Sequence, residues 1–431
     1  MKISVIGCGY LGAVHAAGMA KLGHDVVGID VDQARVYSLN AGKAPFFEPG
    51  FDELLSEVSE SLRFSTDMAD LADATVHFLA VGTPQSESGA ADMTYVDQAI
   101  TALSEHLSEG DVVVGKSTVP VGTAERLRKM IENTGAKLMW NPEFLREGFA
   151  VSDTLSPDRL VYGIREGDDE LVEVLDSVYR QLIDRETPRL VMDYATAELV
   201  KVAANSFLAT KISFINAMAE IADVVGADVT QLADAIGHDA RIGRRFLNAG
   251  IGFGGGCLPK DIRGFMARAN ELGVGQAVDF LNDVDQVNLR RRRRVEEILT
   301  DELGSLEGKT IAVWGLAFKP DSDDIRDSPA LDIAEGIARA GAHVHAFDPE
   351  AMGPASARLG RNGLGDSLTL ASSSTDALEG ADALVIATEW AEFRNFDPTT
   401  AIPRLVVDGR NCLDRDAWKA AGWTYRGMGR R

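Results

Sequence analysis

The sequence predicts an α/β protein in which two Rossmann-like, doubly wound domains are joined by a long central helix. An apolar run at the start of the chain leads directly into the glycine motif Gly7-Cys8-Gly9-Tyr10-Leu11-Gly12. Segments similar to this opening recur in the same order after residue 308. Between the two, residues 196–226 carry one helical pattern without a strand signal or a helix breaker.

Composition bounds the class of protein. A chain of 431 residues with 45% hydrophobic and 25% charged residues favours two or three globular domains. The net charge of −23 argues against nucleic-acid binding, which needs clustered cations. No uncharged apolar run approaches the roughly 20 residues of a membrane-spanning helix. Cys8, Cys257 and Cys412 have neither disulfide-framework nor zinc-site spacing, so we expect no metal and a reducing, cytoplasmic compartment.

The first segment is expected to bind a dinucleotide. Residues 2–6 and 25–29 are apolar runs that flank the glycine motif and a helical pattern. In such a unit Gly7 makes the tight turn, Gly9 admits the pyrophosphate and Gly12 lets the helix pack on the strand.

Asp30 completes this fingerprint. It lies 18 residues after Gly12, close to the spacing of about 20 at which an acid accepts from a ribose hydroxyl. A carboxylate there would repel a 2′-phosphate, so NAD is favoured over NADP.

Two further apolar runs, residues 75–81 and 111–116, end in small polar loops. Because ligands bind at the carboxyl ends of parallel strands, Thr83 and Thr118 are placed to meet the cofactor. Capping of their own loops is the alternative for both threonines.

A third loop, Asn141–Gly148, follows the strand expected over residues 137–140. It carries Glu143 and Glu147 four residues apart, which on a helix would share one face. Either could hold a water or act as a base, and an ordinary pair of first-turn acids is the alternative.

The central helix contains two polar residues that stand out. Lys201 and Asn205 lie one turn apart among small and apolar residues. A partly buried lysine needs an anion or a developing oxyanion nearby, which we favour over a surface lysine with a buried stem. The apolar breadth of the helix also suggests a contact between subunits.

The segment GIGFGGGCLPKD, residues 250–261, centres on Cys257. Its glycines permit positive φ and close approach of a ligand, and Pro259 suits the first turn of a helix. Cys257 would then lie ahead of a helix N-terminus, which favours a thiolate. The alternative is a small buried hydrophobic residue.

The second Rossmann-like segment lacks the glycine fingerprint. In its place this segment carries Lys319 and Arg326. These residues could bind an anionic ligand, or they could be surface charges on a loop. A basic run, Arg290–Arg294, is expected to be a solvated helix face rather than an anion site. The expected strands cover residues 310–314, 342–347 (ending on Asp348), 383–387 and 405–407.

An NAD domain, a second nucleotide-like domain and a reactive thiol together point to oxidation through a thiol-bound intermediate. Oxidation of an alcohol to an aldehyde needs no cysteine. A thiol becomes necessary when the aldehyde is carried on to an acid, because a thiohemiacetal can donate a second hydride and the resulting thioester can be hydrolysed.

The segments STVPVGT, NPEFLREG, ELVKVAANSFLATKISFINAMAEI, GFGGGCLPKD and GLAFKPDSDDIRDSP closely resemble the UDP-glucose/GDP-mannose dehydrogenase family across essentially the whole chain. The resemblance implies a homodimeric enzyme that oxidises UDP-glucose twice at C6, giving UDP-glucuronate and two NADH. GDP-mannose or a UDP-N-acetylhexosamine is the alternative substrate. We therefore expect an NAD-binding domain over residues 1–195, a helical dimerisation region with the cysteine loop over 196–305 and a UDP-sugar-binding domain over 306–431.

The resemblance also implies roles for individual residues. Cys257 would be the nucleophile, Lys201 and Asn205 would support the oxyanion, and Asp261 and Glu143 would position or deprotonate a water shared with Thr118. The NAD set is Gly7, Gly9, Tyr10, Leu11, Gly12, Asp30, Arg35, Thr83, Thr118, Glu147 and Arg326. The sugar-nucleotide set is Glu143, Phe144, Leu145, Arg146, Glu147, Lys201, Asn205, Asn248, Gly252, Phe253, Gly254, Phe318, Lys319 and, from the neighbouring subunit, Arg241.

Gly256 departs from the family pattern, in which many members have serine before the nucleophile. Two rivals use the residues differently. A single-step hydroxy-acid dehydrogenase would use Lys201 as general acid and base and would tolerate Cys257→Ser. An NAD-binding regulatory protein would have a structural Cys257, and it leaves Lys201, Asn205 and Asp261 without a role.

Overall fold

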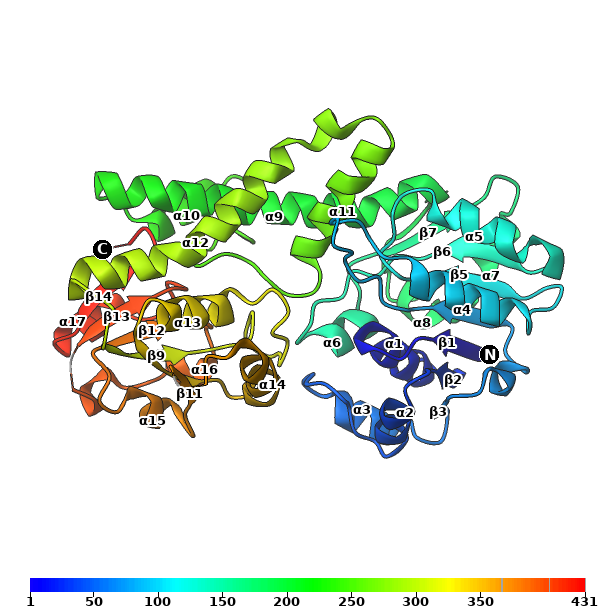
Figure 1. Cartoon of the computed structure of the whole chain (residues 1–431). Helices are drawn as coiled ribbons and strands as arrows, with labels where there is room; N and C mark the ends of the chain where they lie inside the picture. Colours follow the sequence, from blue (N-terminus) through cyan, green and yellow to red (C-terminus); the bar gives the residue numbers. More distant parts are fainter. Residues whose placement is uncertain (366, 403, 431) are drawn as a thin grey trace. The chain divides into compact units, whose positions relative to one another are not determined.

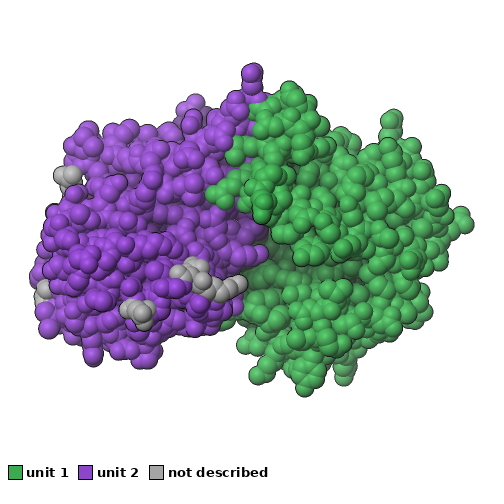
Figure 2. Space-filling view, in the orientation of Figure 1, with its two compact units in different colours: residues 1–204, 263–275 green, residues 205–262, 276–431 purple. Residues whose placement is uncertain are grey.

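The computed structural model describes residues 1–365, 367–402 and 404–430 and divides the chain into two compact units (Figure 2). Unit 1 comprises residues 1–204 and 263–275, and unit 2 comprises residues 205–262 and 276–431. The division falls inside two helices, α9 (Tyr194–Val225) and α11 (Leu258–Glu271). The three-domain division expected from the sequence stays a prediction.

The described residues of unit 1 form an eight-stranded sheet of order β3-β2-β1-β4-β5-β6-β7-β8, drawn in blue to green in Figure 1. Neighbouring strands are parallel except β6 and β7, which pair antiparallel. The strands are β1 (Lys2–Ile6), β2 (Asp25–Ile29), β3 (Leu62–Ser65), β4 (Val76–Leu79), β5 (Val112–Gly115), β6 (Lys137–Trp140), β7 (Leu160–Ile164) and β8 (Arg189–Asp193).

Most of these strands form because their apolar runs are buried on both faces of the sheet, while the edge strand β8 is largely exposed. Val5 and Ile6 are neighbours in β1, yet they pack into two different clusters of buried side chains. Alternate residues of a strand point to opposite faces, so helices must cover both. The helices of unit 1 are α1 (Tyr10–Lys21), α2 (Gln33–Asn40), α3 (Phe51–Glu57), α4 (Thr94–Ser104), α5 (Thr123–Ile131), α6 (Ala150–Leu155), α7 (Glu170–Val178) and α8 (Arg180–Ile183).

Unit 2 contains a six-stranded parallel sheet of order β11-β10-β9-β12-β13-β14. This is the order of the first six strands of the other sheet, so the predicted repeat of a doubly wound fold is confirmed. Its strands are β9 (Thr310–Trp314), β10 (His343–Phe347), β11 (Leu368–Leu370), β12 (Ala383–Ile386), β13 (Leu405–Asp408) and β14 (Thr424–Gly427). The other helices of unit 2 are α10 (Val229–Gly237), α12 (Phe280–Leu303), α13 (Pro329–Arg339), α14 (Met352–Asn362), α15 (Ser374–Leu378), α16 (Ala391–Arg394) and α17 (Arg415–Ala420).

The long central helix is confirmed as α9, and a second long helix, α12, carries the basic run. The prediction of a solvated basic face is wrong for Arg291 and Arg292, which are 0% and 7% exposed. Arg291 Nε donates to the carbonyl of Gly250, and Arg292 Nη2 pairs with Asp327 at 2.8 Å. Both side chains therefore interact with other residues of unit 2.

Five strands were not anticipated from the sequence. Charged residues interrupt or bound the apolar run in some of them, as Arg63 does within β3 and as Arg189 and Asp193 do at the ends of β8. Pairing with a preceding strand holds them in place. Among the described helices, none is long and apolar enough to cross a membrane. The five strands are β3, β7, β8, β11 and β14.

Candidate functional site

The turn between β1 and α1 has the geometry of a phosphate cradle. Gly7 has φ +88°, and a Cβ on Gly12 would lie 1.8 Å from the Gly7 carbonyl oxygen, so only glycine fits at Gly12. A Cβ on Gly9 would meet no described atom within 4 Å. Gly9 precedes the first turn of α1 and has no side chain to cap it, so the amide groups of that turn can receive a phosphate.

Asp30 follows β2 beside this turn and is 6% exposed. Its carboxylate accepts from the Cys8 amide at 2.7 Å and from the Asp32 amide at 2.9 Å. Arg35 Nη1 lies 2.9 Å from one oxygen and 3.0 Å from the other. These bonds fix the carboxylate at the end of the strand, where a ribose would lie.

The loop that carries Thr118 is held from two sides. Thr83 Oγ1 donates to the Thr118 carbonyl at 2.8 Å, which joins the loops after β4 and β5. The carboxylate of Glu198 on α9 accepts from the amides of Gly122 and Ala124 at 2.7 and 2.6 Å. Sequence reasoning missed Glu198, because one acid on a long helix gives no signal of a distant loop.

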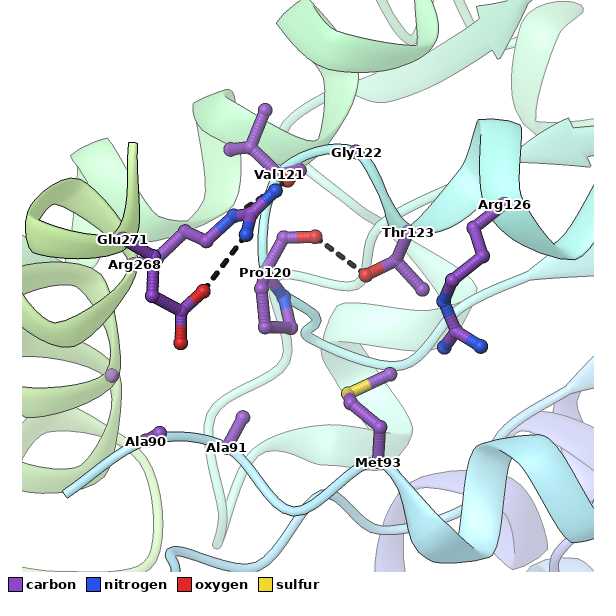
Figure 3. Close-up of a pocket in the computed structure, with 11 residues that line it drawn as sticks. Ala90, Ala91, Met93, Pro120, Val121, Gly122, Thr123, Arg126, Arg268 and Glu271 are labelled. Carbon is purple, nitrogen blue, oxygen red and sulfur yellow. Dashed lines mark hydrogen bonds and ion pairs between the residues drawn. The ribbon is translucent and has the colours of Figure 1, made fainter. Parts of the chain in front are cut away.

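A pocket of about 220 Å³ lies against the same loop (Figure 3). Arg268 donates to the Val121 carbonyl at 3.0 Å and pairs with Glu271, and Thr123 Oγ1 donates to the Pro120 carbonyl. These bonds stiffen the loop after Thr118. The walls of the pocket are formed by Ala90, Ala91, Met93, Pro120, Val121, Gly122, Thr123, Arg126, Gly264, Arg268 and Glu271.

Residues 141–148 form a loop, not a helix, so Glu143 and Glu147 do not share a helix face. Glu143 instead accepts from the Leu145 amide at 2.5 Å, a local turn that satisfies the carboxylate. Its other oxygen lies 2.9 Å from Lys201 Nζ, and both side chains are nearly buried, at 11% and 6% exposed. The structure thus brings together two predicted residues from segments far apart in the sequence.

The neighbouring side chains shape this loop. The ring centroid of Phe144 lies 3.8 Å from the guanidinium of Arg159 and 5.7 Å from Lys201 Nζ. Arg146 is exposed and pairs with Asp153, and Glu147 begins the turn that follows.

Glu48, a residue that sequence reasoning missed, ties this loop to the glycine turn. Its buried carboxylate accepts from the hydroxyl of Tyr10 and from the amides of Gly148 and Ala150, the last two at 2.6 and 2.7 Å. Burial and this hydrogen bond raise the pKa of Tyr10, so the tyrosine stays protonated. Leu11 packs beside Tyr10 against the same core.

In unit 2, Cys257 is exposed and stands directly before α11. Cys8 and Cys412 differ, because burial raises the pKa of both thiols. Cys257 therefore has the access that a nucleophile needs, at the start of a helix whose dipole favours a thiolate.

Asp261 lies one turn into α11, and its amide donates to the Cys257 carbonyl at 2.9 Å. Its side chain is 2% exposed. It accepts from Asn205 Nδ2 at 2.6 Å and from Lys260 Nζ at 2.7 Å. An asparagine amide has two N–H groups, so this bond orients the second one.

The glycines before Cys257 are needed for packing within unit 2. A Cβ on Gly254 would lie 2.2 Å from the Asp327 carbonyl oxygen, and one on Gly255 would lie 2.7 Å from the ring of Phe318. A Cβ on Gly256 would lie 2.4 Å from the Arg326 guanidinium, a side chain that can shift. A serine at position 256 would thus require a different position of Arg326.

Sequence reasoning also missed two residues that hold this backbone. Asn288 on α12 accepts from the Phe253 amide at 2.7 Å and donates to its carbonyl at 2.9 Å. Arg410 donates to the carbonyls of Gly252 and Phe318, both at 3.0 Å. No motif in the sequence links these residues to the cysteine.

The remaining predicted residues of unit 2 are spread over its surface. Arg241 and Asn248 are exposed and interact locally, Arg241 with Asp239 and Asn248 with Arg244. Lys319 Nζ lies 5.2 Å from the ring centroid of Phe318, and the exposed Arg326 is bound by Asp324. These cations can meet an anionic ligand.

Comparison with known proteins places the whole chain. Three models of the UDP-glucose/GDP-mannose dehydrogenase family match: the NAD binding domain at residues 1–183, the central domain at 195–290 and the UDP binding domain at 312–415. A UDP-glucose 6-dehydrogenase of Rhizobium meliloti is 40% identical, covering 100% of both chains.

Two solved structures resemble the chain along its whole length. A UDP-glucose dehydrogenase of Pyrobaculum islandicum has a TM-score of 0.91 and 38% identity, covering 100% of this chain and 98% of that one. A UDP-D-ManNAc dehydrogenase of Pyrococcus horikoshii has a TM-score of 0.84 and 28% identity, covering 100% and 99%.

Proposed function

The chain belongs to the UDP-glucose/GDP-mannose dehydrogenase family, and from this premise we propose that it oxidises UDP-glucose at C6 to UDP-glucuronate. NAD is the cofactor, since residues 1–183 match the NAD binding domain of the family. The glycine turn fits this cofactor, because Gly9 leaves the first turn of α1 open to a pyrophosphate.

The observation that carries the proposal is the exposed thiol of Cys257 directly before α11, one turn from the buried carboxylate of Asp261. NAD, when bound, accepts a hydride from carbon in each of two steps. In our proposal the C6 alcohol is oxidised first. The Cys257 thiolate then adds to the C6 aldehyde, and loss of a second hydride converts the thiohemiacetal into a thioester. Water then displaces the thiolate and releases the carboxylate.

We assign the other residues by the charge that develops in these steps. Lys201 and Asn205 donate to the oxyanion at C6, and Asp261 supports this role by orienting the Asn205 amide. Glu143 holds or deprotonates the water together with Thr118, and its pairing with Lys201 couples the two groups.

NADH formed per UDP-glucose consumed tests the proposal. We expect two NADH from the wild type over many turnovers, and loss of multiple turnover in Cys257→Ser. Cys412→Ser is the matched control, because burial raises the pKa of that thiol and the variant should still give two NADH. One NADH per substrate with an unharmed Cys257→Ser would favour the single-step dehydrogenase.

An N-acetylated sugar nucleotide is the alternative substrate, supported by the similarity to the UDP-D-ManNAc dehydrogenase. UDP-glucose is favoured because identity and TM-score are both higher for the UDP-glucose dehydrogenase. Competition between UDP-glucose and UDP-N-acetylmannosamine at equal concentration separates them by the ratio of kcat/KM.

We also propose a homodimer that forms through α9 and completes the sugar site with Arg241 of the second copy. Three exposed aromatic and aliphatic residues, Phe207, Phe214 and Ile221, recur every seven positions along α9 and form one apolar stripe. The side chain of Arg241 is 88% exposed, as a residue that reaches into a partner must be. The cysteine chemistry needs a thiol that stays reduced, so we propose a cytoplasmic location.

Mixing two inactive variants tests the shared site. Cys257→Ser and Arg241→Ala should each be inactive, and random reassociation should restore about a quarter of wild-type activity, since half of the dimers are mixed and each has one intact site. Arg241→Ala that stays fully active alone would contradict the shared site.

A further inference from the structure

Glu198, a residue without a role in the proposed reaction, is buried on α9 and contacts the end of the loop between β5 and α5, which carries Thr118. It is 2% exposed. One carboxylate oxygen accepts from the Gly122 amide at 2.7 Å, and the other accepts from the Ala124 amide at 2.6 Å. Burial raises the pKa of Glu198, and the hydrogen bonds from these amides oppose that shift. The amides that the carboxylate holds in place therefore also stabilise its ionised form.

The two amides lie at the start of α5, where no side chain of the same segment caps the helix. Gly122 is the N-cap residue and has φ +97°, and it carries no oxygen that could accept from the first turn. A serine or aspartate usually satisfies a helix start locally. In this protein the acceptor comes from a residue at least 74 positions further along the chain. Capping of α5 therefore also fixes the loop relative to α9.

The same turn of α9 carries a predicted catalytic residue. Lys201 follows Glu198 by three positions, and residues three apart on a helix are neighbours on one face. Lys201 Nζ lies 2.9 Å from the Glu143 carboxylate. One turn of α9 thus holds Glu143 through Lys201 and the loop of Thr118 through Glu198.

We propose that Glu198 is a positioning residue that fixes Thr118 relative to the Lys201–Glu143 pair, so that Thr118 and Glu143 hold the same water during hydrolysis of the thioester. This inference rests on the proposed function, in which both residues act on that water. A displacement of about 1 Å in a positioned group can cost about 100-fold in rate. Two hydrogen bonds that fix the loop on the helix therefore act directly on turnover.

Glu198→Gln tests this role with the smallest change of shape. The NH₂ group of the glutamine must face the amide of Gly122 or that of Ala124, so one of the two hydrogen bonds is lost. The variant should still fold, because Arg268 also holds the loop through the Val121 carbonyl. We expect kcat to fall about tenfold, with KM for UDP-glucose within about twofold of the wild-type value.

The step that slows identifies the role. If hydrolysis is impaired, rapid mixing of Glu198→Gln with NAD and UDP-glucose should give a fast burst that approaches two NADH per active site, followed by slow turnover. A general loss of folded enzyme would lower the signal without creating a burst. In the double variant with Thr118→Ala, kcat should be within about twofold of Thr118→Ala alone, because both changes act through one group.

Tyr194→Phe is the matched control on the same helix. The Tyr194 hydroxyl donates to the Leu138 carbonyl of β6, and the residue is 7% exposed. This variant also removes a buried hydrogen bond that anchors α9, but it leaves the bonds between Glu198 and the loop in place. Its melting temperature should fall by an amount similar to that of Glu198→Gln, while its kcat stays at the wild-type value.

Three results would overturn the inference. The first is a Glu198→Gln variant that keeps wild-type kcat or loses it without a burst. The second is an equal loss of kcat in Tyr194→Phe, as a purely structural role of the helix would give. The third is a double variant in which the losses from Glu198→Gln and Thr118→Ala multiply. A wild type that forms one NADH or none from UDP-glucose would instead refute the proposed function, and with it the shared water.

Discussion

The first six strands of the sheet in unit 1 have the same order as the six-stranded sheet in unit 2, yet the helix after the first strand begins differently in the two. In both, a glycine with positive φ follows the first strand, Gly7 at +88° and Gly315 at +104°. In both, an aspartate after the second strand accepts from backbone amides of that turn, Asp30 from Cys8 and Asp348 from Leu316 and Ala317.

The difference lies at the helix that follows. Gly9 leaves the start of α1 without a cap, whereas Ser328 caps α13 through the Leu331 amide and is completely buried. Asp348 is also completely buried and accepts from Trp390 Nε1. The same topology can thus hold a dinucleotide phosphate only where the helix N-terminus is open, which teaches that site chemistry is set by the turn and not by the sheet.

The largest effect should come from exchanging the two aspartates for asparagine. Asp348 accepts from amides on both oxygens, so the NH₂ group of an asparagine must face at least two donors. Each buried donor left without an acceptor costs 1–3 kcal/mol, so Asp348→Asn should destabilise unit 2 by about 3 kcal/mol or more. Thermal unfolding measures this.

Asp30→Asn, at the equivalent position of the first sheet, should cost less stability, because its NH₂ group faces only one backbone amide, that of Cys8 or of Asp32, and it should change the cofactor. Without the carboxylate, a 2′-phosphate is no longer repelled, and the ratio of kcat/KM for NADP to that for NAD should rise about tenfold. If the two variants gave the same phenotype, the contrast between the sheets would be wrong.

The glycine turn offers the next contrast, between two alanine variants. A Cβ on Gly12 would lie 1.8 Å from the Gly7 carbonyl oxygen, so Gly12→Ala should displace the helix and lower NAD affinity about 100-fold. A Cβ on Gly9 would meet no described atom within 4 Å. The melting temperature of Gly9→Ala should therefore stay at the wild-type value, while its affinity for NAD falls about tenfold. Calorimetric titration with NAD measures both. Wild-type affinity in Gly9→Ala would show that the pyrophosphate does not approach this residue.

Local sequence signals predicted the fold, because its strands and helices are written in short segments. Apolar runs placed β1, β2, β6 and β9 at their observed bounds, and the helical pattern placed α9 within two residues at its start. The loop of residues 141–148 was harder, since two acids four apart fit a helix as well as a turn.

The supporting residues could not be predicted. Glu48, Glu198, Asn288 and Arg410 act through contacts with segments that lie 35 or more residues away. Their side chains satisfy backbone groups of a distant loop, and a backbone amide leaves no trace in the sequence. The burial of Arg291 was unexpected for the same reason: its acceptor is the carbonyl of Gly250.

The smallest expected effect comes from removing Ser328, the N-cap of α13 in unit 2. Ser328 Oγ accepts from the Leu331 amide at 3.3 Å and donates to the Leu316 carbonyl at 2.6 Å. Ser328→Ala should lower the free energy of unfolding by about 1 kcal/mol, as loss of an N-cap does. Urea unfolding followed by tryptophan fluorescence reports it, because Trp314 is buried in this sheet.

The affinity for NAD should not change in Ser328→Ala, since removing a buried cap exposes no helix terminus to solvent. Ser373→Ala, which removes the cap of the short helix α15, is the control for a general loss of capping. A measurable gain of nucleotide binding in Ser328→Ala would mean that a single hydroxyl keeps the second crossover closed, and that the two sheets differ by less than their turns suggest.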